Sequence, residues 1–134
     1  MFVRVVPPEM VPQRWSEVEP WFRPGMNYAQ GDYELAHIQM YLSQGQWALF
    51  IIEDGDDIAG AVAVQFFNRP TSRVAFVTAL GGRLVLNPDT FGQLKAICKQ
   101  YGATHFEGAV RESVARLCSR LGLAEKYRIV GAVL

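Results

Sequence analysis

The stretch Trp47-Ala48-Leu49-Phe50-Ile51-Ile52-Glu53-Asp54-Gly55-Asp56-Asp57, continued by Ile58 to Phe67, decides the fold of this 134-residue chain. An apolar run, a turn with Asp-Gly at its centre and a second run rich in β-branched residues together predict a β-hairpin. A second turn over Asn68 to Ser72 leads into a third strand over Arg73 to Leu80, which Gly81-Gly82 ends. The sequence therefore predicts three antiparallel strands in meander order.

The residues before this meander predict one strand and two helices. Phe2 to Val6 is β-prone, and Pro12 fits the first turn of a helix that Pro20 and Pro24 are expected to end. Asp32 is expected to be the N-cap of a second helix, because it precedes apolar residues at helical spacing.

The residues after the meander are expected to alternate between helix and strand, over Pro88 to Tyr101, Ala103 to Val110, Ser113 to Leu121 and Tyr127 to Leu134. Asn87 is the predicted N-cap of the first of these helices, and Ser113 of the second. The resulting order is β-α-α-β-β-β-α-β-α-β. It predicts a single α+β domain over residues 1–134, a mixed sheet with helices on both faces.

The composition narrows the class of protein. Half of the residues are apolar and 19% are charged, which is typical of a globular domain. The longest apolar runs are much shorter than the roughly 20 residues of a membrane helix, so we expect no membrane contact and a cytoplasmic setting. Cys98 and Cys118 have no metal-ligand spacing to either histidine, so no metal site is expected.

The charges are unevenly distributed along the chain, although the formal net charge is zero. Residues 1–57 hold nine acidic and three basic side chains, and residues 58–134 hold ten basic and four acidic ones. A basic face would attract a phosphorylated ligand or an acidic partner, and an ordinary mixture of solvated faces is the alternative. Basic runs with interleaved aromatic residues are lacking, so nucleic acid is not an expected partner.

The element order and two sequence blocks resemble the GNAT (GCN5-related N-acetyltransferase) superfamily. The blocks are Ala103-Thr104-His105-Phe106-Glu107 and Ala115-Arg116-Leu117-Cys118-Ser119-Arg120-Leu121-Gly122-Leu123. The second is similar to the family pattern N-x-x-A-x-x-L-Y-x-K-L-G-F. The chain further resembles small GNAT-like proteins of tailed phages and prophages, at Val6-Pro7-Pro8-Glu9, Trp15 to Pro20, Pro70 to Arg73 and Ala79-Leu80-Gly81-Gly82.

The resemblance implies a cofactor site for acetyl-CoA between two parallel strands that separate. The pantetheine would pair with the backbone of Val77, Thr78, Ala79 and Leu80, and the turn Gly81-Gly82-Arg83 would approach the pyrophosphate. The family's loop, Q/R-x-x-G-x-G/A, is degenerate here, because the second pair of glycines is absent. Pro88 lacks an N–H, and Asp89 places a negative charge where the pyrophosphate would lie.

The resemblance also suggests catalytic residues. Cys118 stands where the family often has the tyrosine that protonates the leaving thiolate, and a buried structural cysteine is the alternative. Glu53 and Glu107, near strand ends, are the candidates for the base that deprotonates the amine, and each is otherwise a solvated charge. Glu112 replaces the family's asparagine, and Arg120 its lysine.

Three functions are compatible with these residues. The first is an acyl-CoA-dependent N-acyltransferase acting on an amine-bearing small molecule or protein. The second is a non-catalytic GNAT-like phage protein, a virion, ejection or assembly component that contacts phage structural proteins, with a homodimer through the apolar tail as one arrangement. A hydrolase using Cys118 and His105 is the least favoured, because no third orienting group is recognisable.

Overall fold

A computed structural model of the protein describes residues 1–82 and 87–134. One sheet has the strand order β1-β2-β3-β4-β5, comprising β1 (Phe2–Val6), β2 (Trp47–Asp54), β3 (Asp57–Arg69), β4 (Ser72–Gly81) and β5 (His105–Gly108). The helices are α1 (Val11–Phe22), α2 (Leu35–Ser43), α3 (Pro88–Gln100) and α4 (Glu112–Arg120), with 3-10 turns η1 (Pro8–Met10) and η2 (Arg23–Tyr28). Strands β1 to β4 are antiparallel neighbours, and β5 is parallel to β4. The predicted mixed α+β architecture is confirmed.

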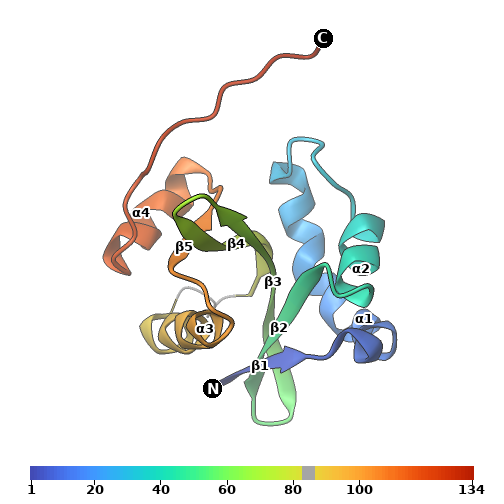
Figure 1. Ribbon diagram of the computed structural model, residues 1–134. Coiled ribbons are helices and arrows are strands. Elements are labelled where there is room, and N and C mark those ends of the chain that lie inside the picture. Colours follow the sequence, from blue (N-terminus) through green and yellow to red (C-terminus); the bar gives the residue numbers. More distant parts are fainter. Residues whose placement is uncertain (83–86) are drawn as a thin grey trace.

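The apolar run of β2 is buried on both faces of the sheet. Leu49 and Ile51 belong to one hydrophobic cluster, and the alternate residues Phe50 and Ile52 belong to another. Because successive side chains of a strand point to opposite faces, a continuous apolar run requires cover on both sides. Figure 1 shows α1 and α2 on one side of the sheet and α3 on the other. The helices therefore lie on both faces, as predicted.

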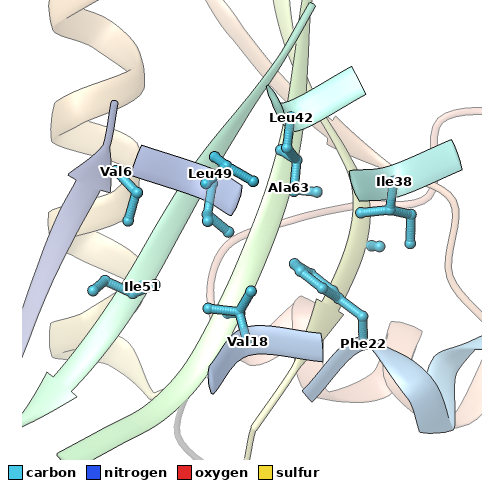
Figure 2. Packing of buried hydrophobic residues seen from close by; sticks show 11 residues of the cluster. Val6, Val18, Phe22, Ile38, Leu42, Leu49, Ile51 and Ala63 are labelled. Atoms are coloured by element: carbon cyan, nitrogen blue, oxygen red, sulfur yellow. The ribbon is translucent and has the colours of Figure 1, made fainter. Parts of the chain in front are cut away.

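The α1–α2 cluster is the larger of the two. Val18 and Phe22 of α1 meet Ile38 and Leu42 of α2 over the sheet, as Figure 2 shows. All four side chains are buried. The opposite cluster joins Leu94 and Cys98 of α3 to the residues of β2, β3 and β4 that face them.

Two helix boundaries before the meander differ from the sequence prediction. Helix α1 passes through Pro20 and ends at Phe22, because burial of Val18 and Phe22 on either side of the proline offsets the lost backbone hydrogen bond. The N-cap of α2 is Glu34 and not Asp32. The backbone N–H of Asp32 donates to the Ala29 carbonyl in a turn, while Glu34 and His37 form a reciprocal capping box.

The predictions for the end of the chain were partly wrong. Strand β5 is confined to His105–Gly108, and Arg111 occupies the N-cap position of α4 in place of Ser113. The final strand predicted over Tyr127 to Leu134 is absent, and this segment has no regular secondary structure. A strand needs a hydrogen-bonding neighbour, and this tail pairs with no strand of residues 1–82 and 87–134. Among the helices that the structure describes, none is both long enough and apolar enough to cross a membrane.

Candidate functional site

Strands β4 and β5 are paired over only part of their length. The parallel register begins at Val74 opposite His105 and ends at Val77 opposite Gly108. Strand β4 continues to Gly81, and over these last residues its paired neighbour is β3. The carboxyl end of β4 therefore presents one backbone edge that β5 does not cover. Ligands of open sheets bind at such carboxyl ends of parallel strands.

A β-bulge at Thr78 coincides with the point where the two strands separate. In the β3–β4 register Val64 pairs with Val77 and Ala63 pairs with Ala79, so Thr78 has no opposite residue. An extra residue of this kind bends its strand and increases its twist. The Tyr33 hydroxyl donates to the Thr78 carbonyl at 2.6 Å, and the Gln65 amide donates to the Thr78 hydroxyl at 2.8 Å. These contacts hold the bend in place.

The other end of the strand pair is closed by contacts between Arg73 and Thr104. The Thr104 backbone N–H donates to the Arg73 carbonyl at 2.8 Å, and the Arg73 N–H donates to the Thr104 hydroxyl at 3.0 Å. The pairing of β4 with β5 is thus fixed where β4 begins and stops at Val77, and we call the unpaired end of β4 beyond that point the wedge.

A pocket of about 340 Å³ lies beside the carboxyl end of β4, where α1 and η2 pack against it. Its lining comes from the end of α1, from η2 and from the end of β4: Pro20, Trp21, Pro24, Gly25, Leu80, Gly81 and Gly82. This lining is mostly apolar, and the main chain of β4 adds a few polar groups. Such a combination suits an organic ligand.

The two glycines of this pocket have a structural reason to be glycine. A Cβ on Gly81 would lie 1.7 Å from the Trp21 carbonyl oxygen, and a Cβ on Gly82 would lie 2.5 Å from the Ala59 carbonyl oxygen. Gly82 also has a φ of 120°, which side chains disfavour. The main chains of α1 and β3 therefore pack directly on the end of β4.

The predicted cofactor residues fall into three groups. Val77 to Leu80 lie where the strands separate, and Gly81 and Gly82 line the pocket. Arg83 lies outside the described residues. The start of α3 is already capped, because the Asn87 side-chain oxygen accepts from the N–H groups of Asp89 at 2.9 Å and Thr90 at 3.5 Å. This helix start therefore offers an anion few unpaired donors.

The predicted catalytic residues are not assembled around the wedge by any described contact. Cys118 is 9% exposed on α4, and burial raises the pKa of its thiol. Glu53 forms an ion pair with Arg4 at the β1–β2 edge. Glu107 accepts two hydrogen bonds from Arg69, at 2.6 and 3.0 Å, and one from Lys126 at 2.9 Å.

The ion pairs of Glu107 with Arg69 and Lys126 make its carboxylate less basic. The Arg69 guanidinium, supported by Lys126, lowers the pKa of the Glu107 carboxyl to about 2. A carboxylate with so low a pKa is a weak base for an ammonium group. Among the described residues, no group of three or more histidine, cysteine and acidic side chains is placed to hold a metal ion.

Two features of the site were missed by sequence analysis. Tyr33 precedes a helix and lies in no motif, so nothing marks it as the residue that binds the Thr78 carbonyl. Burial, with the nearby Asp32 charge, raises the pKa of its hydroxyl, which therefore stays protonated and donates. Arg111 lies over the Tyr28 ring, 4.1 Å from its centroid, and so joins the start of α4 to η2.

Solved structures that include two aminoglycoside acetyltransferases share this fold. No protein-family profile matches the sequence, and no curated protein sequence matches it. A tetramutant of the BH1408 protein from Bacillus halodurans superposes with a TM-score of 0.72 at 12% identity, with 100% of both chains covered. An aminoglycoside acetyltransferase, meta-AAC0020, from an uncultured soil metagenomic sample gives 0.71 at 10% identity, covering 99% of this chain and 94% of that one. The aminoglycoside N-acetyltransferase AAC(6')-Iy in complex with CoA gives 0.70 at 14% identity, covering 99% and 93%.

Proposed function

We propose that this protein is an acyl-CoA-dependent N-acyltransferase scaffold, with acetyl-CoA as the ligand of the wedge. The observation that carries the proposal is that β4 continues past its last pairing with β5, at Val77 and Gly108. The backbone of β4 beyond Thr78, which β5 does not pair with, suits the amide groups of a pantetheine arm, which would pair with it as a strand does. The fold shared with a CoA-bound acetyltransferase supports this assignment.

The reaction proposed is direct attack of an amine on the thioester. The amine nitrogen forms a bond to the acyl carbon, the bond from that carbon to sulfur breaks, and the CoA thiolate takes up a proton. We assign Cys118 as the proton donor because it stands where the family pattern has its tyrosine, and burial, which raises the pKa of its thiol, keeps the thiol protonated. Since Glu53 and Glu107 are held in ion pairs, we assign the proton released by the amine to solvent.

Binding is the first test, because a ligand that selects the native state must raise its melting temperature. We expect acetyl-CoA to raise the Tm of the chain, and Gly25→Leu to abolish that rise by filling the pocket. A Cβ at Gly25 would meet its nearest atom, the Leu80 carbonyl oxygen, at an ordinary 3.7 Å, so this variant is expected to fold. Gly92→Leu, on α3 with open space around its Cβ, is the matched control and should retain the rise. An unchanged Tm for the unmodified chain at millimolar acetyl-CoA would contradict the proposal.

The role of Cys118 is tested separately with a matched pair of cysteine variants. Cys118→Ala is expected to lower kcat for acetyl transfer to a panel of amines and to leave the affinity for acetyl-CoA unchanged. Cys98→Ala, which removes the other buried thiol from α3, should leave kcat unchanged in the protein that remains folded. Equal rates for both variants would remove Cys118 from the mechanism.

A second candidate is a non-catalytic phage protein that uses the same fold as a virion, ejection or assembly component. The capping of α3 by Asn87 favours it, because a helix start that is already satisfied is poorly suited to a pyrophosphate. Failure of acetyl-CoA to bind, together with recovery of the chain in purified phage particles, would favour this candidate over the enzyme.

A further inference from the structure

The contact between Arg111 and Tyr28 holds a positive charge at the surface between α4 and η2. Arg111 is the N-cap residue of α4, and its guanidinium lies over the Tyr28 ring, 4.1 Å from the ring centroid. Tyr28 is the last residue of η2. Both residues are exposed, so a ligand in solution can reach the charge.

The connections on either side of the contact place it near the wedge. Arg111 follows Gly108 by three residues, and Gly108 is where β5 stops pairing with β4. Tyr28 follows Gly25 by three residues, and a Cβ on Gly25 would lie 3.7 Å from the Leu80 carbonyl oxygen. Three residues span at most about 11 Å. The contact thus joins an element near the start of the wedge to an element near its end.

The Arg111 guanidinium has hydrogen-bond donors that its contact with Tyr28 does not use. A guanidinium carries five N–H donors and stays charged at every physiological pH, and an aromatic ring attracts that charge without supplying an oxygen acceptor. Within residues 1–82 and 87–134, Arg111 takes part in none of the ion pairs. Its donors therefore suit an anionic ligand, and phosphate is a group that a guanidinium binds through two parallel hydrogen bonds.

The start of α3 is less suited to a phosphate than Arg111 is. The Asn87 side chain already accepts from the first N–H groups of this helix, and Asp89 puts a carboxylate in its first turn, where it repels an anion. A phosphorylated ligand along the wedge therefore gains more from a cation that stands elsewhere beside it. Because the Tyr28 ring already holds the Arg111 guanidinium in one place, less side-chain entropy is lost when the ligand binds.

We propose that Arg111, positioned by Tyr28, binds a phosphate group of acyl-CoA. The inference rests on the proposed function, since it requires acyl-CoA along the wedge. The guanidinium then does for this chain what the start of α3, occupied by Asn87, cannot do. The thioester lies at the other end of the ligand, so Arg111 contributes to affinity and not to the chemical step.

The test compares the dissociation constants of three ligands, measured by NMR titration. They are acetyl-CoA, acetyl-dephospho-CoA, which lacks the 3′-phosphate, and acetyl-pantetheine, which lacks every phosphate. We expect Arg111→Gln to raise the Kd for acetyl-CoA about tenfold or more and to leave the Kd for acetyl-pantetheine unchanged. Arg111→Lys, which keeps the charge but not the paired donors, should fall between the parent and Arg111→Gln. Arg116→Gln, which removes an exposed arginine from the same helix, is the matched control and should bind acetyl-CoA as the parent does.

The third ligand identifies which phosphate is bound. An effect of Arg111→Gln that persists with acetyl-dephospho-CoA assigns the contact to the pyrophosphate, and an effect that disappears assigns it to the 3′-phosphate. Because Arg111 is exposed, all of these variants are expected to fold.

Two outcomes would overturn the inference and leave the proposed function standing. Equal Kd values of Arg111→Gln and Arg116→Gln for acetyl-CoA would mean that Arg111 does not touch the ligand. An equal loss of affinity for acetyl-CoA and acetyl-pantetheine would mean that Arg111 supports the wedge and binds no phosphate. Failure of acetyl-CoA to bind the unmodified chain is a different result, which overturns the proposed function and this inference together.

Discussion

The Tyr33 hydroxyl and the Thr78 carbonyl are joined by a 2.6 Å hydrogen bond across 45 residues of sequence. It ties the loop before α2 to the bulge at which β4 leaves β5. Tyr33→Phe removes the donor and leaves a half-buried carbonyl without this partner. We expect unfolding free energy to fall by about 1 kcal/mol in denaturant titrations. Tyr41→Phe, where the aromatic ring packs on Trp47, is the control and should change stability less.

Gly81 is predicted to tolerate no side chain. Gly81→Ala places a Cβ against the Trp21 carbonyl oxygen, so α1 or β4 must shift, and we expect a loss of about 1–3 kcal/mol in unfolding free energy. Gly92→Ala is the matched control, because its Cβ has open space within a helix, and it should stabilise the chain by up to about 1 kcal/mol. Equal effects of the two substitutions in denaturant titrations would show that the close approach of Trp21 is not limiting.

The capping role of Asn87 predicts an effect on stability that is separate from ligand binding. Asn87→Ala removes the acceptor for the first N–H groups of α3 and is expected to cost about 1 kcal/mol. Asn87→Asp, which keeps a side-chain oxygen at the same place, should retain most of the stability. Thermal unfolding of the three proteins measures this, and an alanine variant as stable as the parent would contradict the capping assignment.

The Glu107 ion pairs predict a loss of stability in acid. Because the pKa of Glu107 is about 2 in the folded protein and near 4.5 when unpaired, its contribution is complete above the latter value. It declines as the pH falls toward 2, where the folded carboxylate becomes protonated. Glu107→Gln should be less stable at neutral pH and should lose less between pH 5 and pH 2 than the parent.

The control for this comparison is Glu9→Gln, since Glu9 is exposed and takes part in none of the ion pairs among the described residues. The unfolding free energy of Glu9→Gln, measured over the same pH range, should follow that of the parent protein. A Glu107→Gln profile parallel to the parent would mean that the ion pairs do not stabilise the fold.

The sequence predicted the strands best where the apolar pattern and the turn residues indicate the same element. The run Trp47 to Ile52 and the Asp-Gly turn predicted the hairpin, because alternate faces of β2 are both covered by helices. The prediction that Pro20 ends α1 was wrong because Phe22, beyond the proline, is drawn into the core. The tail was predicted as a strand from its residue types, but strand formation also depends on a neighbour that the single chain does not supply.

The site was less predictable than the fold. The family resemblance suggested that two strands separate near Val77 to Leu80, and the backbone pairing does end at Val77. The bulge at Thr78 has no distinctive sequence, because any residue can be the unpaired one. The assigned roles of Cys118, Glu53 and Glu107 stay predictions. The ion pairs of Glu53 and Glu107 come from Arg4, Arg69 and Lys126, which are distant in sequence from the acids they meet.

The position of Trp21 gives the protein an intrinsic optical reporter. All three tryptophans pack against the α1–α2 cluster, and of the three only Trp21 also lines the pocket. A chain carrying Trp15→Phe and Trp47→Phe would keep Trp21, at the pocket, as its single tryptophan. The fluorescence of Trp21 would follow occupancy of the pocket in real time, without a label and without knowing in advance which molecule enters.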